Sequence, residues 1–296
     1  MNRQLSNKKN IMVFVLPALV FFVLLAVVPL IITGFYSFFE YDGISKMEFI
    51  GLQNYIKMLL EDKNFVHSCV NTMVLIFASV FIQLPLAFLL AVTLASGVPG
   101  EKLFRTIYFI PVVISSMVIG RLWMSVFNSN FGLLNTLIRM LGVPDFNYSW
   151  MSNPSTAFIS TVIPAVWQYI GYHMMIMYAG IKSIPKDYYE AAQIDGASKF
   201  RTTMKITIPL LAPVIKICIV FAICGSIKAF DLIYIMTQGG PNKVSHVPAT
   251  LMYENLFKRG AYGYGSAQAF FIVIMCFLIS WIVGKIFKKA EENATL

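Results

Sequence analysis

The chain has 296 residues, of which 58% are hydrophobic and only 12% are charged. Soluble globular domains carry about 25% charged residues, so this composition excludes the ordinary soluble class and indicates a membrane protein. The net charge of +9 does not call for nucleic acid, because much of the excess lies in connections where Lys and Arg retain a loop on the cytoplasmic side.

Six apolar runs are long enough to cross a bilayer core of about 30 Å as helices. They cover residues 11–35, 70–95, 107–127, 157–181, 212–236 and 267–287. The first run is longer than the apolar core of a signal peptide, and no small-residue cleavage site follows it, so we expect a retained span. The sequence therefore predicts one all-α membrane domain over residues 1–296 with six transmembrane helices.

The distribution of Lys and Arg predicts the orientation of these spans. Thirteen basic residues lie in the segments on the N-terminal side of the membrane, among them Arg3, Lys8, Lys288 and Lys289, and seven lie in the segments on the opposite side. Basic residues accumulate in cytoplasmic loops. We therefore expect both termini and the connection over residues 182–211 to be cytoplasmic.

The third and fourth spans carry polar and aromatic side chains. Arg121 lies in the outer half of the third span, close to Trp123. In the fourth span, Gln168 and Tyr172 share a helical face at i, i+4 spacing, and Trp167 lies beside them. A charge within a span marks a functional site by default. The structural alternative is that Arg121 reaches toward the membrane surface and that the aromatic rings pack against helices or lipid.

The connection after the fourth span contains the charged pattern YYEAAQIDGASKFRTTMKITIPLLAP over residues 188–213. Pro185 predicts the first turn of a helix that runs through Gln193, and Gly196 predicts its end. A second short helix over residues 198–206 leads to Pro209 at the threshold of the fifth span. Small, aromatic and acidic side chains favour a docking helix, whereas an amphipathic helix on the membrane surface is the alternative.

The fifth span contains Lys228, Asp231 and Tyr234. Lys228 and Asp231 are three positions apart, so on a continuous helix they share a face and can form an ion pair. In one interpretation the two charges simply neutralise each other. In the other, they line an outward vestibule together with Arg121 and bind a polar solute. The segment after this span, residues 237–248, is rich in turn-forming residues.

Motifs for catalysis and metal binding are not found. The four Cys residues have neither a disulfide pattern nor the spacing of a zinc site, and His67, His173 and His246 are scattered. The phosphate-binding pattern GxxxxGK[ST] does not occur, and no nucleophile stands in a plausible setting with a base. We predict no catalytic residue, no metal ligand and no cofactor in this chain.

Several short motifs recur in a recognisable order along the chain. In the connection over residues 182–211, Glu190, Ala191 and Ala192 are followed by Gly196, Ile206, Ile208 and Pro209. The other segments are FIGLQNYIKML (49–59), NTMVLI (71–76), FRTIYFIPVVIS (104–115), FGLLN (131–135) and FDLIYIMTQGGP (230–241). Together they resemble the sugar-type inner-membrane permeases of binding-protein-dependent ABC importers, whose EAA loop usually has Leu where this chain has Ile208.

This resemblance implies the fold of the type I ABC importer transmembrane domain. The cytoplasmic pattern would then be a coupling helix that sits in a cleft of an ATPase subunit and transmits its closure to the spans. The residues implied in this coupling are Tyr189, Glu190, Ala191, Ala192, Asp195, Gly196, Ala197 and Pro209. Glu190 would be the polar anchor, Ala191 and Ala192 the close-packing surface, and Gly196 the turn.

The resemblance also implies partners and a substrate class. The partners are a second homologous permease, two ATPase subunits that bind ATP and Mg²⁺, an extracytoplasmic solute-binding protein and the cell membrane of a prokaryote, with no nucleic acid. The implied cargo is a carbohydrate, a disaccharide or oligosaccharide, although polyols and glycerol phosphates are carried by similar permeases.

A sugar needs aromatic faces and hydrogen-bonding groups. The candidates in its path are Arg121, Trp123, Trp167, Gln168, Tyr172, Lys228, Asp231 and Tyr234.

Two other functions are compatible with a polytopic membrane protein. An ion-driven secondary transporter would have broken spans, an internal repeat and acidic residues near the midplane, whereas Asp231 is the only acidic residue within the predicted spans. A membrane scaffold without transport would explain neither the polar residues in the spans nor the EAA spacing.

Overall fold

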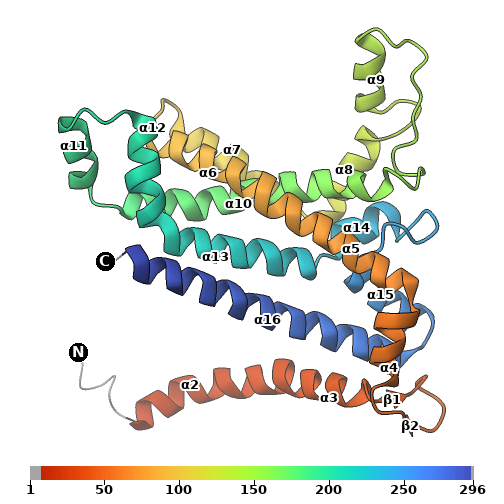
Figure 1. Ribbon diagram of the computed structural model, residues 1–296. Coiled ribbons are helices and arrows are strands. Elements are labelled where there is room, and N and C mark those ends of the chain that lie inside the picture. Colours follow the sequence, from red (N-terminus) through yellow and green to blue (C-terminus); the bar gives the residue numbers. More distant parts are fainter. Residues whose placement is uncertain (1–7, 295–296) are drawn as a thin grey trace. The chain divides into compact units, whose positions relative to one another are not determined.

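The computed structural model describes residues 8–294, and the side chains of residues 12–287, so Arg3 and the side chains of Lys8, Lys9, Lys288 and Lys289 lie outside it. The described chain is predominantly helical (Figure 1). It divides into two compact units, of which the first holds residues 8–62 and 252–273 and the second holds residues 63–251 and 274–294.

The first unit begins with a long apolar helix, formed by α2 (Lys8–Phe22), a π-helical turn (Val23–Val27) and α3 (Val28–Tyr36). A small antiparallel hairpin follows, in which Phe39 of β1 (Phe39–Glu40) pairs with Phe49 of β2 (Glu48–Phe49). After it come α4 (Gln53–Ile56) and a π turn (Lys57–Glu61). The unit is completed by the end of α15 (Pro248–Tyr253), a π turn (Glu254–Lys258) and the first part of α16 (Tyr262–Ala294).

Side-chain hydrogen bonds fix the connections of the hairpin. The Asn54 amide donates to the carbonyl oxygens of Ser37 and Phe39, at 2.9 and 3.0 Å. In the loop between the strands, the Asp42 carboxylate accepts the backbone N–H groups of Ile44 and Ser45. These bonds favour the ionised carboxylate and lower the pKa of Asp42 to about 2.

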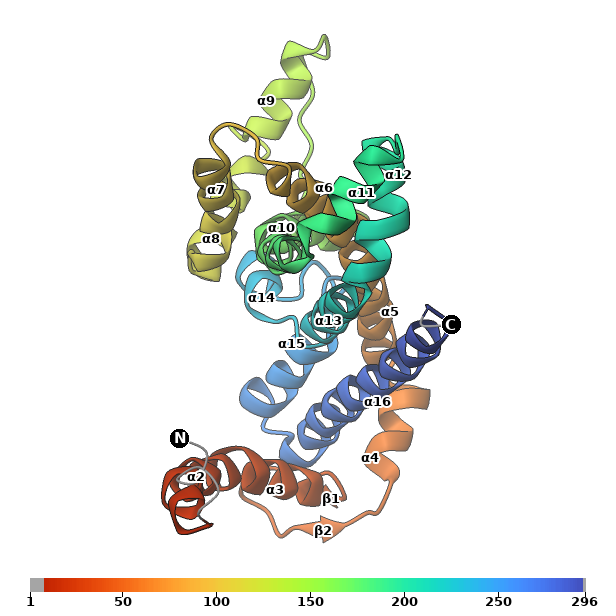
Figure 2. The ribbon, with the colours of Figure 1, turned by 90° about the vertical axis from the view of Figure 1, so that its left-hand side faces the viewer.

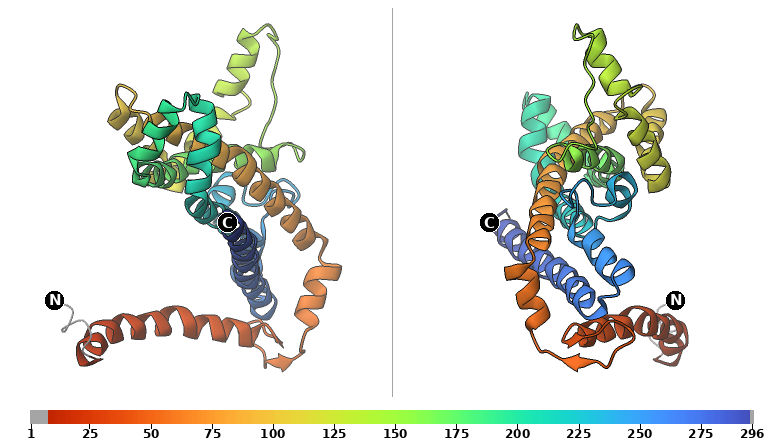
Figure 3. Two further views of the ribbon diagram at one scale, coloured as in Figure 1. Left: turned by 60° about the vertical axis from the view of Figure 1, so that its left-hand side comes forward. Right: turned by 90° about the vertical axis from the view of Figure 1, so that its right-hand side faces the viewer.

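The second unit contains the remaining helices. They are α5 (Lys63–Ala78), a π turn (Ser79–Gln83), α6 (Leu84–Ala95), α7 (Glu101–Val113), α8 (Ser116–Val126), α9 (Leu133–Met140), α10 (Ala157–Ser183), α11 (Lys186–Ile194), α12 (Lys199–Thr202), a π turn (Thr203–Thr207), α13 (Ile208–Ile227) and α14 (Asp231–Thr237). Figure 2 looks nearly along α10, which packs against α6, α7 and α13. The yellow-green α9 projects away from these helices (Figure 3).

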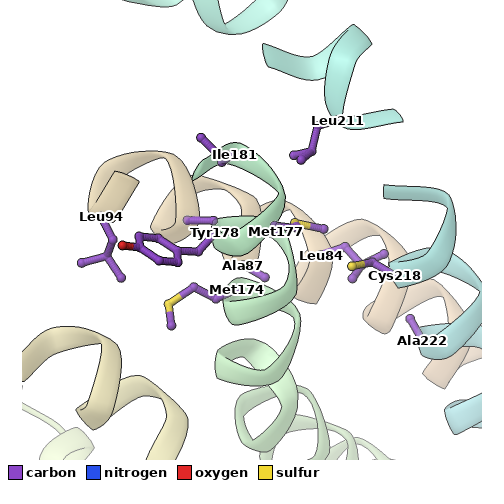
Figure 4. Close-up of a cluster of buried hydrophobic side chains, with 11 residues drawn as sticks. Leu84, Ala87, Leu94, Met174, Met177, Tyr178, Ile181, Leu211, Cys218 and Ala222 are labelled. Carbon is purple, nitrogen blue, oxygen red and sulfur yellow. The ribbon is translucent and has the colours of Figure 1, made fainter. Parts of the chain in front are cut away.

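The core of the second unit lies around α10. Met174, Met177 and Tyr178 of this helix are buried against Leu84 and Ala87 of α6 (Figure 4). On the side of α7, Gly171 allows a very close approach, because a Cβ atom at this position would lie 1.8 Å from the carbonyl oxygen of Tyr108. Burial of these apolar side chains, at roughly 25 cal/mol per Å², holds α6, α7, α10 and α13 together.

Within residues 8–294, four helices are long and apolar enough to cross a membrane: Met12–Tyr36, Lys63–Ala95, Lys199–Thr237 and Tyr262–Phe287. A fifth crossing is present if α7 and α8 count as one. The predicted fourth span is helical as α10 but is not among these helices. The structure therefore shows four or five apolar helices where the sequence predicts six spans.

The third predicted span, residues 107–127, is built from two helices rather than one continuous helix. Its two parts, α7 and α8, meet at an angle of 97°. Ile114 and Ser115 have extended backbones, and the Ser115 side chain caps α8 by accepting the N–H of Met117 at 3.3 Å. Pro111 also removes one helical hydrogen bond just before the bend. Pro111 thus weakens the end of α7, and the Ser115 cap begins α8 as a separate helix.

The fifth predicted span also differs from a single helix over residues 212–236. It begins earlier, because α12 continues through a π turn into α13, and it breaks between Ile227 and Asp231. Phe230 has φ −140° and ψ −65°, outside the helical region. Lys228 and Asp231 therefore do not share a helical face, and no ion pair joins them within the described residues.

Candidate functional site

The second unit encloses a cavity of about 380 Å³. Its walls come from α5 and the following π turn, the middle of α10, the end of α13, the start of α14 and the first residue of α8. The polar residues of the lining are Ser79, Gln83, Ser116, Gln168, Tyr169, Tyr172, His173, Ser226, Lys228 and Asp231. The cavity therefore combines an apolar frame with hydroxyl, amide, imidazole and charged groups, which suits a polar solute.

Four of the eight substrate-path candidates meet in this cavity. Gln168 and Tyr172 of α10 line it from one helical face, as their i, i+4 spacing predicts. Lys228 and Asp231 line it from the break between α13 and α14, and both side chains are exposed. The break thus presents a cation and an anion to the cavity separately, so each can bind a ligand group.

The other four candidates lie elsewhere. Arg121 lines a separate pocket of about 350 Å³. Trp123 and Trp167 contact each other edge to face, with centroids 5.8 Å apart and an interplanar angle of 68°. Tyr234 stacks on Phe230 at 5.1 Å and 14°. For the two tryptophans and Tyr234, the structure shows packing contacts of the kind that aromatic pairs favour.

Sequence reasoning missed a polar seam along one wall of the cavity. The Gln83 amide and His173 Nδ1 are 2.8 Å apart, although the two residues are distant in sequence. Nearby, the Ser226 hydroxyl of α13 donates to the Ser79 hydroxyl at 3.1 Å. Ser79 and Gln83 stand four positions apart within an apolar run, and this spacing was the available signal. The seam ties α10 and α13 to the π turn that follows α5.

The predicted docking helix is α11, and its boundaries follow the predicted signals. Pro185 precedes it in an extended conformation, and Gly196 follows it with φ +72°. The N–H of Gly196 donates to the Gln193 carbonyl at 3.1 Å, and the N–H of Ala197 donates to the Ala192 carbonyl at 2.9 Å. This pair of bonds is a Schellman motif, which needs a left-handed residue and therefore favours glycine.

The coupling candidates differ in accessibility. Glu190 and Ala191 are exposed, but the Ala192 side chain is only 7% exposed and packs within this chain. The Tyr189 hydroxyl lies 3.3 Å from the Thr207 hydroxyl and ties α11 to the following π turn. Of the two alanines assigned to a close-packing surface, only Ala191 can thus offer its side chain to another protein.

The remaining coupling candidates surround the turn after α11. Asp195 and Gly196 are exposed, Ala197 is half-buried, and Pro209 is exposed at the start of α13. Two large apolar side chains flank this turn, Ile194 with 86% exposure and Phe200 with 74%. The second predicted helix does not end before Pro209, because the π turn carries the helix on from α12 into α13. The exposed surface thus places two large apolar side chains beside acidic groups, and exposed apolar patches rimmed by polar residues mark interaction sites.

The segment over residues 237–248 is anchored to α5. The Asn71 amide donates to the carbonyl oxygens of Val244 and His246, at 2.7 and 2.8 Å. Val247 is fully buried among apolar residues of α5, α10 and α14. Most of the second half of this segment is therefore part of the protein's own core.

No group of three or more His, Cys, Asp and Glu side chains that could hold a metal ion is present in the part of the chain that the structure describes.

Comparisons with known proteins identify the family of this chain. Residues 83–291 match the family model described as "Binding-protein-dependent transport system inner membrane component". The probable ABC transporter permease protein YurN of Bacillus subtilis (strain 168) is 34% identical over 97% of this chain and 99% of its own length. The trehalose/maltose transport system permease protein MalF of Thermococcus litoralis is 32% identical over 90% of each chain.

A solved structure supports the fold independently. A bacterial ABC transporter involved in the import of the acidic polysaccharide alginate contains a chain that superposes with a TM-score of 0.82, covering 94% of both chains at 21% identity. The family match covers more than half of the sequence, and the resemblance seen in the motifs is confirmed. The chain thus belongs to the binding-protein-dependent transport system inner membrane components and is a multi-pass ABC transporter permease.

Proposed function

We propose that this chain forms half of the translocation path of an ATP-driven importer for a carbohydrate, a disaccharide or oligosaccharide. The observation that carries the proposal is the position of α10. The middle of this helix lines the polar cavity, and its last residue, Ser183, lies three positions before the exposed α11. One rigid helix therefore connects a solute-sized cavity with a docking surface.

The substrate class follows from the relatives and from the chemistry of the cavity. One relative is named for the transport of trehalose and maltose, and sugars need aromatic faces together with hydrogen-bond donors and acceptors. Tyr169 and Tyr172 supply aromatic rings, while Gln168, Lys228 and Asp231 supply donors and acceptors. We assign substrate contact to these residues and leave Trp123, Trp167 and Tyr234 as packing residues.

The assembly implied by the family has six spans in this subunit, with α10 and the bent pair of α7 and α8 included, and both termini in the cytoplasm of a prokaryote. Two ATPase subunits would bind ATP and Mg²⁺ and receive α11, a second homologous permease would complete the path, and an extracytoplasmic solute-binding protein would deliver the sugar. The breaks in the third and fifth spans are features expected of a secondary transporter, but the family match supports the ATP-driven class.

Purification of the complex tests this proposal. We expect a tagged chain, extracted in mild detergent, to recover one other permease and an ATPase, identified by mass spectrometry, together with ATPase activity. Recovery of the folded chain alone, still able to accumulate solute in vesicles on an ion gradient, would contradict the ATP-driven proposal and favour a secondary transporter.

Substitution of Lys228 tests the role of the cavity. We expect Lys228→Met to lower the initial rate of uptake about tenfold, or to shift the ratio of rates between two sugars by about the same factor. The reason is that hydrogen bonds to charged groups are worth about 1.5–3 kcal/mol. The measurement is the initial rate of uptake for a panel of sugars at equal membrane expression.

Lys63→Met is the matched control, since Lys63 is exposed and lies outside the cavity lining. If Lys228→Met lowers only the amount of folded protein and leaves uptake per molecule unchanged, Lys228 has a structural role and does not contact the substrate.

A further inference from the structure

A cluster of polar side chains lies where α6, α7 and α10 meet, near the end of α10 that leads to α11. Its centre is Tyr178, whose side chain is buried in the apolar core with Leu94 and Ile181 (Figure 4). The Tyr178 hydroxyl donates a hydrogen bond to the Glu101 carboxylate, in the first turn of α7. A buried tyrosine of the α10 core is thus bonded to a charged group on a different helix.

Two cations complete the cluster, Arg105 from α7 and Lys182 from the end of α10. The Arg105 guanidinium lies 5.1 Å from the centroid of the Tyr178 ring and also 3.8 Å from the Glu101 carboxylate. The Lys182 ammonium lies 5.6 Å from the same centroid and donates to the Ala95 carbonyl at 3.0 Å, at the end of α6. Cation–π contacts and charge-assisted hydrogen bonds both favour this arrangement.

The position of the cluster links the docking helix to the cavity wall. Tyr178 and Lys182 belong to the last two turns of α10, and α11 begins at Lys186. On the other side, α7 runs from Glu101 to the bend, and the first residue beyond the bend, Ser116, lines the cavity. A displacement of α11 that moves the end of α10 therefore reaches α7, and through it the cavity, by way of the bonds around Tyr178.

We propose that Tyr178 is a positioning residue of the transport cycle, which makes the start of α7 move together with the end of α10 when the motor moves α11. This inference rests on the proposed function. The hydroxyl of Tyr178 acts through Glu101, and Tyr178 is not among the residues that line the cavity. Loss of the hydroxyl leaves the apolar ring in its core and the close contact of α7 with α10 at Gly171 in place, but it frees the start of α7 from the end of α10, so that hydrolysis continues while the cavity wall follows it less.

The variant Tyr178→Phe tests this role, because it removes one hydrogen bond and retains the ring. In proteoliposomes that contain the complete transporter, we expect the ATP hydrolysed per solute transported to rise about tenfold, the factor that corresponds to about 1.4 kcal/mol. The ATPase activity itself and the amount of assembled complex should change little. A purely structural residue would lower both rates in proportion to the folded protein and leave their ratio unchanged.

The matched control is Tyr108→Phe, since Tyr108 lies on the same α7 and its hydroxyl has no hydrogen bond within the described residues. A second variant, Glu101→Leu, removes the acceptor of this bond and should raise the ratio as well, and its combination with Tyr178→Phe should add little, because coupled partners are not additive. Additive effects, or equal ratios for Tyr178→Phe and Tyr108→Phe, would overturn the inference. If the unmodified complex shows no ATP-driven uptake, it is the proposed function that fails.

Discussion

Glu190→Arg is expected to abolish ATP-driven uptake while the protein remains folded and in the membrane. Glu190 is exposed on α11 and belongs to the segment that resembles the EAA loop. Reversal of a central charge in a docking surface costs about 2 kcal/mol or more, which corresponds to a loss of roughly 30-fold in affinity for the partner. Because Glu190 has no part in the core, the fold should be unaffected. The measurements are uptake in vesicles and co-purification of the ATPase.

Glu48→Arg provides the control for charge reversal at an exposed position outside α11, and it should leave both measurements unchanged. The coupling role of α11 is refuted if Glu190→Arg transports normally at equal expression. If the ATPase still co-purifies while uptake is lost, Glu190 acts in transmission of the movement and not in docking.

Gly171→Ala should have a comparably large effect, but on stability. The added Cβ atom would lie 1.8 Å from the Tyr108 carbonyl oxygen and 2.5 Å from its carbonyl carbon. Both atoms belong to the α7 backbone, which cannot rotate away as a side chain can, so α7 and α10 must separate. Overpacking of this kind typically costs 1–3 kcal/mol, and occasionally more. The midpoint of thermal unfolding in detergent and the yield of monodisperse protein should both fall.

Gly284→Ala is the matched control, because Gly284 is also helical and a Cβ atom there would meet nothing within 4 Å. Alanine favours the helix over glycine by about 1 kcal/mol, so this variant should be as stable as the unmodified protein or slightly more stable. An unchanged unfolding midpoint for Gly171→Ala would show that α7 and α10 do not pack backbone to backbone.

The features that the sequence predicted well depend on local signals. Pro185 and Gly196 determine where α11 begins and ends through their own backbone preferences, so both boundaries can be read without knowledge of the rest of the fold. The apolar runs predict helices for the same reason. Gln168 and Tyr172 could be placed together because α10 is regular between them.

The features that the sequence did not predict depend on single backbone positions or on tertiary contacts. The extended conformation of Ser115 bends the third span, and the break at Phe230 separates Lys228 from Asp231. A mean hydropathy taken over 20 residues is not sensitive to the conformation of one residue. His173 drew no attention as an isolated histidine, because its partner Gln83 lies on a different helix. Such residues lie around one cavity because of the way α10 packs against the neighbouring helices. The periodicity of a sequence does not show how helices pack against one another.

The break between α13 and α14 has a consequence for water. Over residues 228–230 the backbone leaves the helix in the middle of an apolar run, and polar groups of such backbone are tolerated at membrane depth only where protein or water satisfies them. The N–H groups of Lys228 and Ala229 are bonded within the protein, but the charges of Lys228 and Asp231 face the cavity without pairing with each other, so we expect water to hydrate them between transport events. A hydrated stretch at this depth would conduct protons and ions if water reached it from both sides of the membrane. The membrane potential is therefore maintained only while the protein closes the path on one side.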